Sequence, residues 1–332
     1  MGKDTHMGTL NTATIPGVRL PVTRIVQGSI QLNTEDQAVG FTQLDTMVDV
    51  GINTIDSAYI YGGGAQDRLI GSWMAARGNR EEIVVIAKGC HPGEGRNRVT
   101  PYDIGTQLHD ILIRMKTDYV DLFVLHRDDK NVAVEPIVDT LNQYVREGKI
   151  NAFGGSNWTP ARLAEANAYA ASTGQVGFCC SSPNFSLARQ LHEPWDDCVT
   201  ISGPENEAER SWYHAGNMPL FTWSSMAGGF MSGRITRSNT ATFTDYFGKL
   251  AVHCYASEDN FVRVDRAAIL AERKGLSMPQ IALAYVLNYP LNIFALVGSA
   301  NEDEMRSNAE ASLVTLTPDE RDFLDLKADF VS

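Results

Sequence analysis

The chain of 332 residues lacks any long apolar run and carries few positive charges for its length. No stretch approaches the roughly 20 apolar residues that cross a membrane, and the opening MGKDTHMGTLNTATIPG has no apolar segment typical of a signal peptide. The 40 acidic residues against 28 basic ones give a formal net charge of −12, which argues against a general nucleic-acid-binding protein. We therefore expect a cytoplasmic protein that binds neither a membrane nor nucleic acid.

Cysteine is also scarce, and its spacing matches neither a metal site nor a disulfide framework. The five cysteines are Cys90, Cys179, Cys180, Cys198 and Cys254. An odd number without such spacing is typical of a reducing compartment. We expect no bound metal.

A glycine-rich phosphate-binding turn is missing near the start of the chain. A doubly wound dinucleotide-binding sheet would place a GxGxxG turn after its first strand, whereas QGSIQL (27–32) offers one glycine. The chain also has no low-complexity tract and no linker rich in Pro, Gly and Ser. Its length suits two small domains or one α/β barrel.

What the chain does contain is a regular alternation of short β-branched segments with helical patterns. The near-continuous apolar character of the segments is typical of parallel strands buried on both faces. They cover the ranges 23–29, 53–58, 82–89, 119–126, 149–156, 176–182, 219–225 and 292–300. Eight such strands predict a (β/α)8 TIM barrel with its active site at the C-terminal rim of the strands. We expect one domain, residues 1–332, with residues 1–17 as a short flexible or capping segment.

Titratable side chains close three consecutive predicted strands. Asp56, Lys88 and His126 stand at these ends, and the ends of barrel strands converge on one rim. Each has an ordinary structural explanation, Lys88 as a snorkelling side chain and His126 as a hydrogen-bonded rim histidine. Three such groups on adjacent strands favour a functional site.

Tyr61 follows Asp56 by five residues and is expected on the loop above the same rim. A phenol has a pKa of about 10 and needs help to exchange a proton near neutrality. An ammonium such as that of Lys88 favours the phenolate and lowers that pKa by roughly 1–3 units, while Asp56 holds Lys88 charged. His126 can orient a carbonyl oxygen beside the phenol. The set describes a proton donor to a developing alkoxide, and it requires a hydride source.

Several motifs carry a resemblance to a known family. They are DSAYIYG, IAKG, DYVDLFVLHRDD, GKINAFGGSNW, WSSMAGGFMSGR and LVGSANEDEMRSNAEA. Together they resemble the aldo-keto reductase family from about Val18 to the last predicted helix. The resemblance implies NADPH-dependent, reversible reduction of an aldehyde or ketone to an alcohol.

The resemblance also implies the role of each site residue. Tyr61 would be the general acid, Asp56 and Lys88 would tune it, and His126 would position the substrate carbonyl. Tyr61 and His126 would contact the substrate. Trp195 is a further expected substrate contact, on its position in the segment 192–199 and not on the resemblance. The residues implied in cofactor binding are Gly28, Ser29, Asp56, Ser156, Asn157, Ser182, Trp223, Ser224, Ser225, Met226, Ala227, Gly228, Gly229, Arg234, Gly298, Ser299, Glu304 and Asn308.

Three of these positions depart from the family pattern. Ser182 stands where many members have a glutamine, and Trp223 replaces a common tyrosine. Glu304 stands near where many members place an arginine for the 2′-phosphate of NADPH, and a carboxylate there favours the 2′-hydroxyl of NADH. Arg234 and Arg306 supply cations that could reach the phosphate. NADPH remains the expected cofactor, with NADH as the alternative.

Segments without family-level motifs are expected to set the substrate preference. They are residues 89–99, 192–199 and the long connection 236–260. Two other functions remain open: a cofactor-sensing regulatory subunit with little turnover, and a Schiff-base lyase that uses Lys88. The lyase ranks last because it needs a neutral amine, and Asp56 would keep Lys88 charged. We expect a monomer or small homo-oligomer acting on a small-molecule carbonyl compound.

Overall fold

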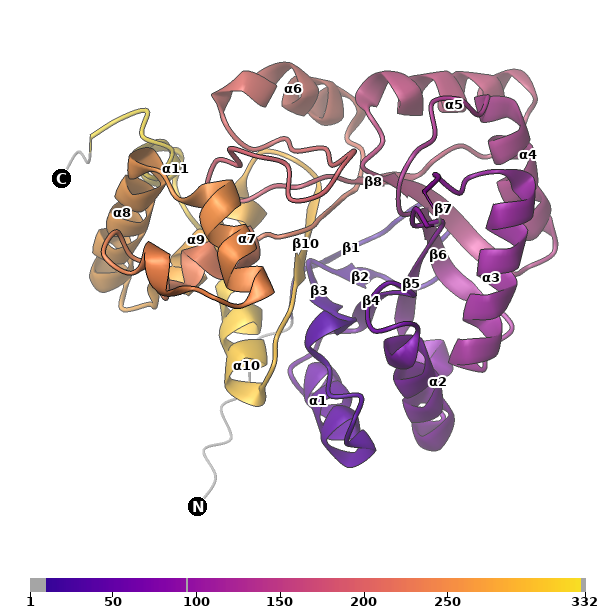
Figure 1. The fold of residues 1–332 in the computed structure, drawn as a ribbon, viewed down its shortest axis with the longest axis horizontal. Coiled ribbons are helices and arrows are strands. Elements are labelled where there is room, and N and C mark those ends of the chain that lie inside the picture. The colour runs from indigo at the N-terminus through magenta and orange to yellow at the C-terminus, as the bar shows by residue number, and fades with distance from the viewer. Residues whose placement is uncertain (1–9, 94, 330–332) are drawn as a thin grey trace.

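The computed structural model describes residues 10–93 and 95–329, and within them eight parallel strands close into a barrel (Figure 1). Around the barrel the order is β10-β3-β4-β5-β6-β7-β8-β9. The bounds are β3 Ile25–Gly28, β4 Thr54–Ala58, β5 Val84–Gly89, β6 Val120–Leu125, β7 Ile150–Ser156, β8 Cys180–Ser182, β9 Leu220–Thr222 and β10 Ile293–Val297. The predicted (β/α)8 fold is confirmed.

Helices follow the strands and form the outer layer of the barrel (Figure 1). Their bounds are α1 Gln37–Asp49, α2 Ala65–Arg77, α3 Pro101–Met115, α4 Val134–Arg146, α5 Pro160–Ser172, α6 Glu207–Gly216, α7 Tyr246–Tyr255, α8 Glu258–Lys274, α9 Met278–Asn288, α10 Glu302–Ala311 and α11 Pro318–Leu324. Local sequence explains several starts. Thr100 precedes α3 and Ser277 precedes α9, and each forms a capping box that satisfies free amides of the first helical turn.

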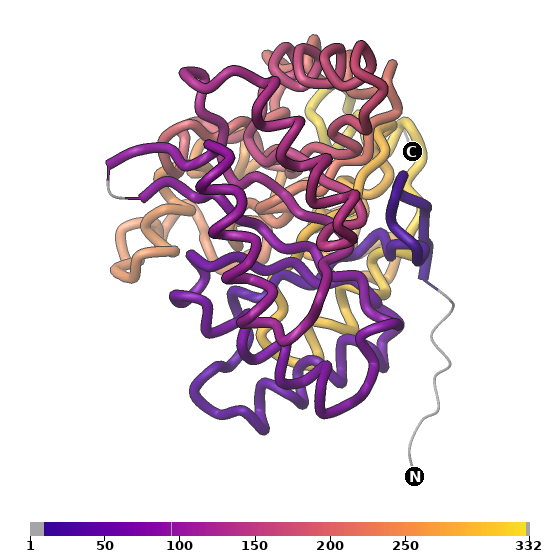
Figure 2. The backbone as a smooth tube through the Cα atoms, turned by 90° about the vertical axis from the view of Figure 1, so that its right-hand side faces the viewer, coloured from indigo at the N-terminus to yellow at the C-terminus, as the bar shows by residue number. Residues whose placement is uncertain are grey.

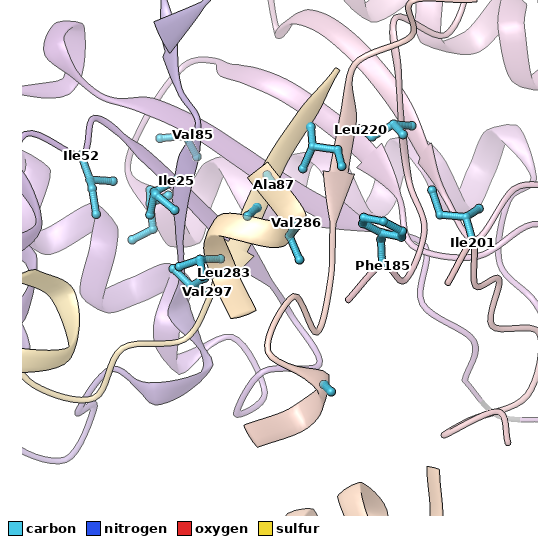
Figure 3. Close-up of a cluster of buried hydrophobic side chains, with 14 of the residues drawn as sticks. Ile25, Ile52, Val85, Ala87, Phe185, Ile201, Leu220, Leu283, Val286 and Val297 are labelled. Carbon is cyan, nitrogen blue, oxygen red and sulfur yellow. The ribbon is translucent and has the colours of Figure 1, made fainter. Parts of the chain in front are cut away.

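Side chains alternate between the two faces of each strand. On β5, Val84 and Ile86 belong to the cluster inside the barrel, whereas Val85 and Ala87 pack outward against the helices. Figure 3 shows Val85 and Ala87 in the outer cluster, which also includes Ile25 and Val297 of other strands. This period of two aims residue 88 inward, at the carboxyl end of the strand.

The opposite end of the barrel is covered by the start of the chain. Strands β1 (Thr12–Ala13) and β2 (Val22–Thr23) pair antiparallel, and Ile15 and Val22 join the interior apolar cluster. Residues 1–9 of the predicted capping segment lie outside the described residues. The covered end leaves the C-terminal rim as the open end of the barrel.

The connection 236–260 contains a helix, α7, and a short 3-10 turn, η5 (Thr240–Thr242), where we expected a long loop. Asp245 caps α7 by accepting the Gly248 amide at 2.8 Å. In Figure 2 the connections after β5 and β9 project from the same side of the molecule. Because each connection leaves the carboxyl end of a parallel strand, both lie at the C-terminal rim.

Candidate active site

Asp56 and Lys88 meet inside the barrel, as the strand alternation predicts. Lys88 Nζ lies 2.9 Å from Asp56 Oδ2, and both side chains are 2% exposed. The two strands are hydrogen-bonded neighbours, with Ala58 opposite Lys88 in the register. A buried ion pair of this kind is costly to desolvate and is retained where its charge is used.

The pair shifts both of its own pKa values. Burial raises the pKa of the Asp56 carboxyl, and the attraction of Lys88 offsets this only in part. Burial opposes the ammonium of Lys88, but the Asp56 carboxylate and the Tyr61 phenol outweigh it, so the pKa of Lys88 is raised. Lys88 is therefore held as a cation, as predicted.

Tyr61 lies on the turn after β4, where its amide donates to Ala58 O at 3.0 Å. Its ring meets that of His126 edge-on, with 5.9 Å between centroids. The expected fall in the pKa of Tyr61 is wrong in its net direction: burial raises this pKa, and the lowering effect of Lys88 does not compensate. The phenol is therefore protonated at neutral pH, the form that a proton donor needs.

His126 follows β6 and is buried with its rim neighbours. Burial, and then the charge of Lys88, hold its pKa well below the ordinary value, so the ring is neutral. Its Nδ1 is buried without a partner among the described residues. A buried donor without an acceptor is more costly than a bare lone pair, so the proton belongs on Nε2. That assignment makes Nε2 a hydrogen-bond donor toward the rim.

The rim also holds His91, a residue that the sequence did not single out. Its ring meets His126 edge-on, with 4.9 Å between centroids, and the Tyr61 ring also meets His126 edge-on, at 5.9 Å. The fully buried Cys90 has φ 63°, and this left-handed turn directs the chain away from β5 just before His91. His91 Nδ1 lies 2.9 Å from Pro92 O, which fixes the ring. In the sequence, His91 stands three residues after Lys88 and before Pro92, and this spacing does not indicate that it contacts His126.

The residues at the strand ends fit a polar ligand. Five buried polar atoms at these ends have no partner among the described residues. They are Gln27 Oε1, Ser29 Oγ, Asp56 Oδ1, His126 Nδ1 and Ser182 Oγ. Buried polar groups are rarely left unpaired, and five of the eleven such atoms in the described residues lie at these strand ends, which is typical of a site that a ligand completes. A nicotinamide cofactor, with its amide and hydroxyl groups, suits it.

Asn157 makes more hydrogen bonds within the protein than its implied role in cofactor binding suggests. Its Oδ1 accepts the Val199 amide at 3.0 Å and the Trp223 indole N–H at 3.2 Å. Its Nδ2 donates to Ser156 Oγ at 3.1 Å. Asn157 therefore orients Trp223, and the unpaired Ser182 Oγ is the freer partner for a carboxamide.

The segment after β9 has the backbone of an anion cradle. Ser224, Ala227, Gly228 and Gly229 have φ values of 50°, 52°, 60° and 89°. Left-handed residues close together turn successive amides toward a common side, where they can hold phosphate oxygens. Ser225 and Met226 lie within this segment, and Arg234 follows it. The geometry fits a pyrophosphate.

The end of β10 and the start of α10 carry the remaining predicted cofactor residues. Gly28 and Gly298 follow from close packing at the strand ends, since a Cβ on Gly28 would lie 3.3 Å from Val297 O. Asn308 Nδ2 donates to the buried Ser299 Oγ at 3.0 Å. Glu304 is exposed, and its Oε2 accepts the Ala300 amide at 2.8 Å.

The two arginines near this helix have different surroundings. Arg306 is paired with Glu302 at 2.5 Å, so it is engaged on its own helix. The guanidinium of Arg234 lies over the Phe243 ring at 5.5 Å, with no carboxylate within ion-pair distance among the described residues. Arg234 is therefore the freer cation for a phosphate.

Aromatic side chains from two connections gather beside Trp223. The Trp195 indole N–H donates to Tyr246 Oη at 2.7 Å, and its ring centroid lies 6.4 Å from that of Trp223. Trp195 is 43% exposed and Tyr246 61% exposed. We call Trp195 and Tyr246 the aromatic wall. Tyr246 was missed because only the fold brings α7 to the segment 192–199.

Two kinds of feature are absent from residues 10–93 and 95–329. No cluster of three or more His, Cys, Asp or Glu side chains able to hold a metal ion occurs there. No described helix is long and apolar enough to cross a membrane.

The barrel and this rim agree with the comparisons to known proteins. The model of the Aldo/keto reductase family matches residues 24–328. The chain therefore belongs to the Aldo/keto reductase family, a family of oxidoreductases that use nicotinamide cofactors.

Individual relatives are distant but match along most of the chain. An uncharacterized oxidoreductase of Bacillus subtilis (strain 168), YrpG, is 26% identical over 310 residues, covering 90% of this chain and 89% of that protein. The aryl-alcohol dehydrogenase (NADP(+)) of Phanerodontia chrysosporium is 25% identical over 340 residues, covering 93% and 83%. The glycerol dehydrogenase AKR11B4 from Gluconobacter oxydans has the same fold, with a TM-score of 0.79, 21% identity and coverage of 95% and 94%.

Proposed function

We propose that this protein is an NAD(P)H-dependent carbonyl reductase that reversibly converts an aldehyde or ketone to an alcohol. The observation that carries the proposal is the protonated phenol of Tyr61 beside the neutral ring of His126 and the buried ion pair of Lys88 and Asp56. When bound, the reduced nicotinamide supplies a hydride. The chain supplies the proton and the geometry.

The roles follow from the chemistry of each group. Nε2 of His126 donates a hydrogen bond to the substrate carbonyl oxygen and holds it near the Tyr61 hydroxyl. The phenol gives its proton to the oxygen as negative charge develops there. The charge of Lys88 then stabilises the phenolate that remains, and Asp56 keeps Lys88 charged and in place.

For the cofactor, the favoured choice is NADPH, with NADH as the alternative. The segment from Ser224 to Gly229, with its four left-handed residues, would hold the pyrophosphate, and Ser182 Oγ would hold the carboxamide. Arg234 favours a 2′-phosphate, whereas Glu304 opposes one. NADPH is favoured because it is the cofactor that members of this family generally use.

For the substrate, the aromatic wall favours a carbonyl compound with an aromatic ring. Exposed aromatic side chains that cluster at a site tend to bind flat apolar groups. An aryl-alcohol dehydrogenase among the relatives supports the same choice. A single domain, a cytoplasmic location, and a monomer or small homo-oligomer remain predictions from the sequence.

A carbonyl screen tests the proposal. Aromatic and aliphatic aldehydes and ketones are supplied with NADPH and with NADH at matched concentrations, and loss of absorbance at the reduced nicotinamide band is followed. We expect turnover, higher with aromatic compounds. Tight cofactor binding without turnover on any compound would instead support the cofactor-sensing regulatory subunit.

A further inference from the structure

Arg127 is a buried cation that links His126 to the segment 195–199, which carries Trp195 of the aromatic wall. It directly follows His126 and is 4% exposed. Its Nη1 donates to His126 O at 2.9 Å, its Nε to Asp196 O at 3.3 Å, and its Nη2 to Cys198 Sγ at 3.3 Å. One planar guanidinium therefore contacts both His126, which follows β6, and the segment 195–199.

The charge of Arg127 has no direct counterion in the described part of the chain. No carboxylate lies within ion-pair distance of it there, and a buried guanidinium usually has one. Carbonyl oxygens and a thiol satisfy its N–H groups but leave the positive charge uncompensated. This charge lowers the pKa of His126, although less than burial and Lys88 do.

The segment 195–199 is also hydrogen-bonded to Asn157, the residue that follows β7. The Val199 amide donates to Asn157 Oδ1, the atom that also accepts the Trp223 indole N–H. Trp195, at the start of the segment, donates to Tyr246. Arg127 and Asn157 thus hold residues 196–199, and Tyr246 of α7 holds Trp195 at the start of the segment.

We propose that Arg127 is a positioning residue for carbonyl reduction, whose planar guanidinium fork holds the segment that carries Trp195 at a set place relative to His126. The inference rests on the proposed function. With the wall fixed, the ring of a substrate is held while its carbonyl oxygen reaches Nε2 of His126. The charge of Arg127 also opposes protonation of His126 at Nδ1, so the ring stays neutral while Nε2 donates.

Two substitutions separate the fork from the charge. Arg127→Lys keeps a cation but cannot make the planar set of three contacts. Its KM for an aromatic aldehyde should rise about tenfold, because two modest hydrogen bonds to the segment are lost. The acid limb of its kcat/KM profile should stay in place. Arg127→Met should raise KM similarly and move the acid limb to higher pH, since His126 protonates more easily without the nearby cation.

The groups that face His126 are Tyr61, Lys88, His91 and Arg127. Because His91 also titrates, the profiles are repeated with His91→Phe, where the shift caused by Arg127→Met should persist. An unchanged KM in both Arg127 variants, or an acid limb that Arg127→Met leaves in place, would overturn the proposal.

Substitutions at Cys198 test the same contact without removing a buried charge. Cys198→Ala removes the acceptor of Nη2, and KM should rise roughly two- to fivefold with an unmoved acid limb. Cys198→Ser offers an oxygen acceptor and should restore KM toward the wild-type value. If Cys198→Ala matches the wild type, the fork does not hold the segment.

Arg80→Lys is the matched control at the other end of the same strand. Arg80 pairs with Asp121 at 2.8 Å and donates to Tyr119 O at 3.0 Å, at the start of β6. It should lower stability and leave KM and the acid limb unchanged. An equal change of KM in Arg80→Lys would reduce the effect of Arg127 to general destabilisation and overturn the proposal.

Hydrogen exchange tests the contact without turnover. Arg127→Lys and Cys198→Ala should speed amide exchange in residues 192–199 and leave α3 unchanged. Unchanged exchange in residues 192–199 would contradict the inference. Faster exchange there, together with no carbonyl reduction by the wild-type protein, would contradict the proposed function instead.

Discussion

Lys88 Nζ lies 2.9 Å from Asp56 Oδ2, and the two groups form an ion pair sealed inside the barrel, next to a phenol whose pKa burial has raised. The pair is therefore best understood as a fixed charge that serves Tyr61. It is not an ordinary stabilising salt bridge, because a buried pair recovers little more than its own desolvation cost.

Removal of one partner of this pair should be costly, and removal of both less so. Lys88→Met leaves an unpaired buried carboxyl group and should lower the free energy of unfolding by about 3–5 kcal/mol. It should also lower kcat/KM strongly, with Asp56→Asn acting in the same direction more weakly. In the double variant the losses should be smaller than the sum, because the two residues act as one unit.

Denaturant titration and kcat/KM for the four proteins of this cycle provide the measurement. The exposed pair of Arg77 and Asp45 is the control, and Arg77→Met should cost no more than about 1 kcal/mol. Strict additivity of the Lys88 and Asp56 effects would contradict the coupling.

The raised pKa of Tyr61 gives the two reaction directions opposite pH dependences. Reduction needs the protonated phenol, so its rate should be level through neutral pH and fall only as the pH passes the raised pKa. Alcohol oxidation needs the phenolate and should rise with pH. Lys88→Met removes the cation that favours the phenolate, so the alkaline limb should move to still higher pH. An alkaline limb of reduction near pH 7–8 in the wild type would contradict this account.

Glu304 offers a test of cofactor choice. Its charge would oppose a 2′-phosphate, and because Glu304 is exposed, one such contact is worth about 0.2–1 kcal/mol. Glu304→Arg replaces a repulsion by an attraction, so it should strengthen NADPH binding relative to NADH by roughly 2- to 30-fold. The Glu304 carboxylate also accepts the Ala300 amide, so Glu304→Gln is the control that keeps this contact and removes the charge.

Fluorescence titration of the three proteins with both cofactors measures the ratio. Glu304→Gln should give a smaller change in the same direction as Glu304→Arg. An unchanged ratio in both would mean that Glu304 does not face the ribose.

The aromatic wall predicts a substrate-dependent effect. Trp195→Ala removes a ring from the wall and should raise KM for aromatic aldehydes roughly five- to tenfold, because ring contacts add about 0.5–1.5 kcal/mol beyond their buried area. Small aliphatic aldehydes should be little affected. Tyr102→Ala removes a ring that is 77% exposed on α3 and is not part of the aromatic wall, and it serves as the control. Equal losses with both substrate types would remove the wall from substrate selection.

The barrel and the central residues could be predicted because they depend on local pattern. The period of two along each strand and the common rim of parallel strands together bring Asp56, Lys88 and His126 to one place. The net pKa of Tyr61 could not be predicted, because it depends on how deeply the folded rim buries the phenol.

Contacts between connections were also beyond the sequence. His91 meets His126 only because Cys90 turns the chain, and Tyr246 meets Trp195 only because α7 forms and lies beside the segment 192–199. The role of Arg127 could not be predicted, because its contacts with Asp196 and Cys198 exist only in the folded chain. Such residues follow no spacing rule, since their partners lie far away in the chain.

The most direct test of the account is a comparison of Tyr61→Phe with the wild type in single-turnover reduction of an aromatic aldehyde by bound NADPH. The substitution keeps the ring against His126 and removes only the proton donor. The rate should fall by roughly 10²–10⁴-fold while the affinity for NADPH, measured by fluorescence titration, is unchanged. Retention of most of the rate in Tyr61→Phe would contradict the central claim that this phenol gives its proton to the substrate oxygen.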